Sequence, residues 1–248
     1  MKPTPQAVPR CHAVVPCAGV GERAGTAGPK QYQPLAGRAV VAHTLEALAA
    51  VAALDRIIVV LAAQDARFEA EVGPALAGRT TAARRGGATR AASVLAGLEL
   101  LTECGADEQD WVLVHDAARC LLQPAAVLRL IDACRDDAVG GLLAMPVADT
   151  LKTSASQPAR AQATLVRTDK WLAQTPQMFR LGMLRNALGQ AGDAVTDESS
   201  ALEAIGLQPL LVRGAADNLK VTWPEDFMLA EALLQARDKA VDRTQECL

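Results

Sequence analysis

The chain has 248 residues, of which 50% are hydrophobic and only 3% aromatic, and its formal net charge at pH 7 is −3. Such a length allows one large α/β domain or two small ones, and the slightly acidic balance disfavours a nucleic-acid-binding protein. No apolar run reaches the ~18 residues that a membrane-spanning helix needs, so we expect no contact with a membrane.

In chain order, the proline-rich residues 1–10 predict a flexible tail rather than a signal peptide, because they lack an apolar run. Short β-branched runs at 11–16, 56–62 and 111–116 predict strands that are buried on both faces. The segments 39–51, 89–101 and 123–135 carry apolar residues at helical spacing. This alternation predicts an α/β fold with a mostly parallel twisted sheet flanked by helices.

The pattern breaks at 148–169, which is polar and has no helical periodicity. We interpret this segment as a projecting β-arm, although a mobile surface loop is the other interpretation. A closing helix over 224–236 has Pro224 in its first turn. The sequence therefore predicts a single domain over 11–237 and a frayed tail over 238–248.

The six cysteines are scattered and form no Cys-x-x-Cys pair, and none of the three histidines has metal-ligand spacing to a cysteine. This arrangement disfavours a structural zinc site. Reduced thiols and the missing signal peptide together predict a cytoplasmic protein.

The first motif that carries chemistry is VPCAGVGERAGTAGPK, which follows the strand that ends at Pro16. Glycines such as Gly19 and Gly21 let the backbone approach phosphate oxygens, and Arg23 and Lys30 supply positive charge. The spacing is neither the dinucleotide fingerprint nor the Walker A pattern. A tight structural loop therefore remains an alternative at this point.

The second motif, RRGGATRAASVLAGL, places Gly87 before a helix whose early residues include Ser93. Such a helix start can present N–H groups to an anion or a base, but it can also be a plain turn with a surface serine. The third motif, VLVHDAARC, places Asp116 at a strand end, close to Arg119. This is a favoured position for a metal-binding or hydroxyl-binding carboxylate, whereas the alternative makes Asp116 a helix cap.

Seven motifs in order resemble those of the 2-C-methyl-D-erythritol 4-phosphate cytidylyltransferase family. They are PCAGVGERAG…GPKQY, GGATRAASVLAGL, VHDAARC, PVADTLK, VRTDKWLAQTPQMF, TDESSALEAIG and ADNLKVTWPEDF, and they run from about Val14 to Phe227. The resemblance implies a Rossmann-like nucleotidyltransferase fold and a homodimer formed through the 148–169 arm. It also implies a reaction of CTP with methylerythritol phosphate, with Mg²⁺ or another divalent cation as cofactor.

The resemblance assigns roles to residues of this chain. Arg23 and Lys30 would stabilise the transition state, and Arg167 and Lys220 complete the catalytic set. The CTP-binding residues would be Pro16, Cys17, Ala18, Gly19, Gly21, Gly87, Ala88 and Ser93. The substrate-binding residues would be Asp116, Arg119, Thr150, Arg167, Thr175, Thr196 and Lys220, with Thr150 and Arg167 reaching across the dimer. Asp116 and Asp217 are the metal candidates.

Some positions depart from the family pattern. Cys17 stands where alanine is usual, and Ala88 stands where an acidic residue is often found. If the base is read through backbone groups, both changes should be tolerated. The alternatives are a ribitol 5-phosphate or other sugar-phosphate cytidylyltransferase on the same fold, and a non-catalytic nucleotide-binding regulator.

Overall fold

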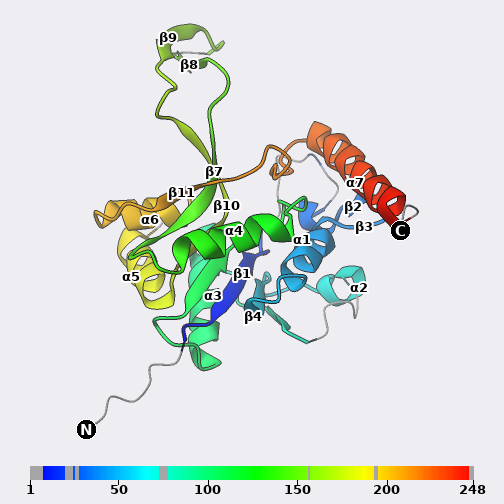
Figure 1. The fold of residues 1–248 in the computed structure, drawn as a ribbon, viewed down its shortest axis with the longest axis vertical. Helices are drawn as coiled ribbons and strands as arrows, with labels where there is room; N and C mark the ends of the chain where they lie inside the picture. Colours follow the sequence, from blue (N-terminus) through cyan, green and yellow to red (C-terminus); the bar gives the residue numbers. More distant parts are fainter. Residues whose placement is uncertain are drawn as a thin grey trace.

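A seven-stranded sheet forms the centre of the protein in a computed structural model, which describes residues 8–19, 25, 28–72, 78–155, 157–192 and 195–245 (Figure 1). The strand order is β11-β7-β10-β6-β1-β4-β5. The strands are β1 (Cys11–Pro16), β4 (Leu54–Val60), β5 (Thr80–Ala83), β6 (Trp111–Val114), β7 (Gly140–Pro146), β10 (Trp171–Arg180) and β11 (Leu210–Arg213). β10 runs antiparallel to both of its neighbours, and the other paired strands are parallel. The predicted mostly parallel sheet is confirmed.

Helices cover both faces of this sheet, because alternate residues of the central strands enter two different apolar cores. In β1, Ala13 and Val15 face one core and Val14 faces the other. The first core contains α1 (Val40–Ala49) and α4 (Pro124–Cys134), and the second contains α3 (Arg90–Glu103), α5 (Leu181–Ala191) and α6 (Glu198–Ala204). Strands buried on both faces explain the continuous apolar runs in the sequence.

Several smaller elements pack near helix α1. They are the 3₁₀ turn η2 (Lys30–Tyr32), the two-stranded pair β2 (Pro34–Leu35) and β3 (Arg38–Ala39), and the short helix α2 (Phe68–Val72). The segment that connects β1 to this region includes residues 20–24, which lie outside the described residues.

The segment between β7 and β10 forms an arm that projects away from the body of the protein (Figure 1). It carries the antiparallel pair β8 (Leu151–Ser154) and β9 (Ala161–Leu165), which is separate from the main sheet. The arm leaves large apolar side chains in solvent: Val166 is 73% exposed and Leu165 45%. The predicted β-arm is therefore correct, and its exposed apolar surface needs explanation.

The closing helix α7 (Pro224–Gln245) is longer than the sequence pattern predicts. We expected it to end at 236 and to be followed by a frayed tail over 238–248, but the helix continues to Gln245. The added stretch, RDKAVDRTQ, contains neither glycine nor proline, and its arginine, lysine, alanine and glutamine residues favour helix continuation. Among the described residues, no helix is both long and apolar enough to span a membrane.

Candidate active site

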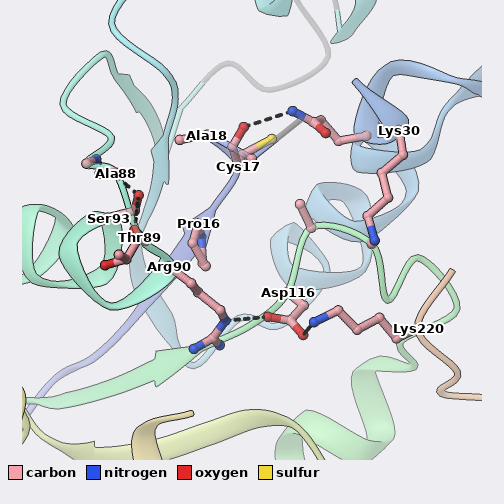
Figure 2. Close-up of a pocket in the computed structure, with 15 residues that line it drawn as sticks. Pro16, Cys17, Ala18, Lys30, Ala88, Thr89, Arg90, Ser93, Asp116 and Lys220 are labelled. Carbon is pink, nitrogen blue, oxygen red and sulfur yellow. Dashed lines mark hydrogen bonds and ion pairs between the residues drawn. The ribbon is translucent and has the colours of Figure 1, made fainter. Parts of the chain in front are cut away.

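A cavity of about 370 Å³ opens where the carboxyl ends of the parallel strands meet the following loops. It is lined by the segment after β1 (Pro16 to Gly19), the turn η2 (Lys30 and Gln31), the start of α3 (Gly87 to Arg90, with Ser93), the segment after β6 (Asp116 to Ala118), and Lys220. In Figure 2, Ala88, Thr89 and Ser93 lie on one side of the cavity and Lys30 lies on the other. The volume suits a small ligand, and the position is the usual ligand site of open α/β sheets.

Close backbone packing shapes the wall of the cavity next to the first loop. A Cβ atom on Gly86 would lie 2.3 Å from Cβ of Ala18 and 2.7 Å from the carbonyl oxygen of Leu61. A Cβ atom on Gly87 would lie 2.5 Å from that of Ala92. Gly86 needs glycine because the chain after β1 and the chain after β4 both touch it, and Gly87 needs glycine because it packs against the first turn of α3.

Ser93 stabilises the start of α3 through two hydrogen bonds. This buried hydroxyl donates to the carbonyl oxygen of Thr89 at 3.0 Å and accepts from the N–H of Gly87 at 3.2 Å. Thr89 caps the helix by accepting from the N–H of Ala92 at 3.1 Å. Ser93 therefore shapes the Gly87–Thr89 turn that faces the cavity, and the turn offers mainly backbone groups and the methyl group of Ala88.

The turn η2 is tied to the first strand and to the opposite rim. Gln31 donates to the carbonyl oxygen of Cys17 at 3.0 Å, and the ammonium of Lys30 donates to the carbonyl oxygen of Val221 at 2.8 Å. The Cys17 side chain is only 3% exposed, and burial raises the pKa of its thiol. Cys17 is thus a packing residue rather than a reactive nucleophile.

Asp116 lies at the centre of a chain of charged groups along one side of the cavity (Figure 2). Its Oδ1 accepts from Nε of Arg90 at 2.9 Å, and its Oδ2 pairs with the ammonium of Lys220 at 2.8 Å. Burial by itself raises the pKa of this carboxyl, but Arg90 and Lys220 outweigh burial and hold the pKa below its usual range. Asp116 is therefore ionised at neutral pH.

A second cavity of about 190 Å³ shares Arg90, Asp116 and Lys220 with the first. Its other lining residues are Arg119, Ala173, Gln174, Thr175, Gln177, Thr196 and Asp197. The guanidinium of Arg119 donates to the carbonyl oxygen of Asn218 at 2.7 Å, and its buried Nε has no hydrogen-bond partner in the described part of the protein. Cations outnumber carboxylates in this second cavity, so it favours an anionic ligand.

Thr175 connects the end of β6 to β10. Its buried hydroxyl accepts from the N–H of Asp116 at 3.1 Å and lies 3.0 Å from Nδ1 of His115. On the other side of the ring, Nε2 of His115 lies 3.2 Å from the carbonyl oxygen of Arg119. Nε2 therefore carries the proton and Nδ1 accepts from Thr175. Full burial lowers the pKa of His115 to about 4, so the imidazole is neutral at pH 7.

The structure gathers most of the predicted site residues around these two adjoining cavities. The first cavity includes Pro16, Cys17, Ala18, Gly19, Lys30, Gly87, Ala88, Ser93, Asp116 and Lys220, and the second adds Arg119, Thr175 and Thr196. The predictions for Arg23 and Gly21 lie outside the described residues. The alternative in which Asp116 caps the next helix is wrong, because α4 begins at Pro124 and its N-cap is Gln123.

Three predicted residues stand apart from both cavities. Thr150 and Arg167 are exposed and lie beside the hairpin of the arm, so within a single chain they do not join the site. Asp217 accepts from Gln123 at 2.8 Å and pairs with Arg237 at 2.7 Å. Its carboxylate therefore serves to hold α7 on the body, and the cavity linings do not include it.

Sequence reasoning missed Arg90 and Glu198. The guanidinium of Arg90 donates to both oxygens of the fully buried Glu198 carboxylate, at 2.6 and 3.0 Å. One signal was available: an arginine at the first position of a helix opposes the helix dipole, which favours a nearby carboxylate. The identity of that carboxylate, 108 residues away, was not readable from the sequence.

The fold, the paired cavities and the charged groups define an α/β nucleotidyltransferase. Solved structures of that class agree. One described as a crystal structure of 4-diphosphocytidyl-2C-methyl-D-erythritol synthase is 40% identical, with a TM-score of 0.81, and the match covers 92% of this chain and 100% of that one. The 2-C-methyl-D-erythritol 4-phosphate cytidylyltransferase from Thermus thermophilus is 30% identical, with a TM-score of 0.73 over 91% of this chain and 99% of that one.

The chain belongs to the IspD family of 2-C-methyl-D-erythritol 4-phosphate cytidylyltransferases, whose family model matches residues 11–236. The enzyme of that name from Burkholderia vietnamiensis is 51% identical over 92% of this chain and 97% of its own length. A bifunctional IspD/IspF enzyme from Albidiferax ferrireducens is 56% identical over 98% of this chain, which spans 57% of that longer protein. The resemblance inferred from the motifs is confirmed.

Proposed function

We propose that this protein transfers the cytidylyl group of CTP to 2-C-methyl-D-erythritol 4-phosphate. A phosphate oxygen of the acceptor attacks the α-phosphorus of CTP in line. The bond from that phosphorus to the bridging oxygen of the β-phosphate breaks, and pyrophosphate leaves with the bonding electrons. The products are 4-diphosphocytidyl-2-C-methyl-D-erythritol and pyrophosphate.

The observation that carries this proposal is the pair of adjoining cavities with Arg90, Asp116 and Lys220 in their common wall. A transfer between two bound phosphates needs two anion sites that meet at the reacting atoms. The larger cavity has the glycine-rich turns and the start of α3, which suit a nucleotide. The smaller one is rich in arginine and lysine, which suits an acceptor phosphate.

Two cations act on the nucleotide side. Lys30 lies on the cavity wall opposite Ala88, where its ammonium can neutralise the charge that develops on the phosphates during transfer (Figure 2). We assign the same role to Arg23 from the family motif. The base would be read by the backbone of the Gly87–Thr89 turn, since Ala88 offers no polar side chain.

On the acceptor side, Lys220 and Arg119 would bind the phosphate and Thr196 the alcohol groups. Asp116 orients Lys220 through the 2.8 Å ion pair, so the ammonium presents its remaining protons to the acceptor. Thr150 and Arg167 would complete this side from a second copy of the chain. The exposed apolar side chains of the arm, Leu165 and Val166, support a homodimer formed there.

The fit of Mg²⁺ to these residues rests on a single carboxylate. Both oxygens of Asp116 already pair with cations, and the described residues contain no group of three metal-binding side chains. This donor set suits Mg²⁺ that takes most ligands from substrate phosphates and water, with Asp116 as its candidate protein contact. The ion would neutralise charge on the triphosphate. Asp217, the other metal candidate, pairs with Arg237 instead.

We also propose a cytoplasmic location. Within the described residues, the cysteines at positions 11, 17, 104, 120 and 134 are free thiols, which suits a reducing compartment.

The test is pyrophosphate release with Mg²⁺, crossing CTP, UTP, ATP and GTP against methylerythritol phosphate and ribitol 5-phosphate. Release confined to CTP with methylerythritol phosphate is the expected result. Release with ribitol 5-phosphate instead would keep the chemistry but change the acceptor. A folded protein without release for any pair would overturn the enzyme and favour a nucleotide-binding regulator.

A further inference from the structure

Arg90 lines both cavities, and behind their common wall it forms an ion pair with the buried Glu198. Glu198 is the first residue of α6 and is fully buried, and its carboxylate receives two hydrogen bonds from the guanidinium of Arg90. Arg90 is the first residue of α3 and makes a third bond, through Nε, to Asp116 at 2.9 Å. One side chain thus connects two helix starts to the end of β6.

This connection spans both halves of the site. Thr89, just before Arg90, lines the larger cavity, whereas Thr196 and Asp197, just before Glu198, line the smaller one. The chain of contacts continues from Asp116 to Lys220 at 2.8 Å. Glu198, Arg90, Asp116 and Lys220 therefore form one line of alternating charges across the wall between the cavities.

A buried carboxylate that lines neither of these two cavities needs a reason. Burial raises the pKa of Glu198, whereas the two hydrogen bonds from Arg90 favour its ionised form. The start of α6 is already held without it, because Asp197 caps the helix and the N–H of Ser199 donates to Gln177 at 2.7 Å. Glu198 therefore serves to orient the guanidinium of Arg90, because its two carboxylate oxygens accept from Nη1 and Nη2 of that group.

We propose that the Arg90–Glu198 pair is a positioning element that sets the alignment of the nucleotide and acceptor half-sites, by fixing Asp116 and through it Lys220. This inference rests on the proposed transfer reaction. Neither residue takes part in bond making. The pair keeps the attacking oxygen and the α-phosphorus in line, so its loss lowers kcat far more than it weakens binding of CTP.

The first variant is E198Q, which keeps the shape of the side chain but removes its charge and one of its two acceptor oxygens. We expect kcat to fall about 10-fold to 100-fold, the scale of a misplacement on the order of 1 Å, while KM for CTP changes less than about 2-fold. The matched control is E103Q. Glu103 also accepts two hydrogen bonds from one arginine, Arg85, but on the exposed end of α3, and kcat should be unchanged.

Variants of Arg90, the other charged residue of the pair, distinguish a positioning role from a purely structural one. If the two residues act as one unit, the variants R90Q and R90Q/E198Q should lose about as much kcat as E198Q, rather than the product of the single losses. The double variant removes the charge of Glu198 together with that of its partner, so we expect it to lose less stability than E198Q or R90Q alone. Thermal unfolding measures the folded fraction, and kcat is expressed per folded enzyme.

The inference is overturned if folded E198Q or R90Q/E198Q keeps kcat within about 3-fold of the unmodified enzyme, the scale of a contact that does not affect alignment. Losses that multiply in the double variant would also overturn it. The unmodified enzyme is assayed first with CTP and methylerythritol phosphate. Failure there removes the proposed function, whereas failure of the variants alone removes only this inference.

Discussion

The hydroxyl of Thr175 should stabilise the end of β6, and the substitution Thr175→Val tests this. Valine keeps the shape of the side chain but leaves two buried polar groups unpaired: the N–H of Asp116 and Nδ1 of His115. Neither atom has another partner in the described part of the structure. Each unpaired group costs about 1–3 kcal/mol, so we expect a loss of about 3 kcal/mol in the free energy of unfolding. For a chain of this size that lowers Tm by about 6–12 °C.

The matched control is Thr175→Ser, which keeps the hydroxyl and removes one buried methyl group. Its cost should be about 1 kcal/mol. Urea unfolding of the two variants at pH 8, where His115 is neutral in the folded and unfolded chain, isolates the hydrogen bonds. Equal stability of the valine and serine variants would refute the reasoning, because it would mean that the hydroxyl satisfies neither group.

Further predictions follow from charge, burial and close packing. Lys30→Ala should lower kcat by about two to three powers of ten with Tm unchanged, the scale for one transition-state donor, and near-normal turnover would remove Lys30 from the mechanism. Arg167→Ala should raise KM for the acceptor, and weakened CTP binding in its place would contradict the assignment. His115 is protonated near pH 6.5 when unfolded but near pH 4 when folded, so stability is retained above 6.5 and falls below it, by about 2 kcal/mol between pH 7 and pH 5. Urea unfolding at the two pH values should show a smaller difference for His115→Gln. Gly86→Ala places a Cβ 2.7 Å from the carbonyl oxygen of Leu61 and should cost about 1–3 kcal/mol, whereas Gly19→Ala, which has open space, should not.

Periodicity in the sequence was sufficient for the order of elements. The apolar runs of β1, β4 and β6 and the helical spacing of α1, α3 and α4 gave the alternation that implies a parallel sheet. These signals are local, since burial of both sheet faces requires consecutive apolar residues. The helix α7 was underestimated because its last turns are charged and carry no apolar stripe, so helix propensity was the only available signal.

The sequence by itself determined which residues are candidates for the site, because each stands in a recognisable local motif. They are the glycine-rich turn after β1, Lys30, Asp116, Arg119, Thr175 and Lys220. Only the tertiary structure decided which of them share a cavity and what their partners are. Asp217 reads like a metal ligand but is paired with Arg237 of the closing helix, and the hydroxyl of Thr175 is used by Asp116 and His115. The physical reason is that an ion pair such as Arg90 with Glu198 depends on two helix starts meeting in space, and chain spacing carries no record of that distance.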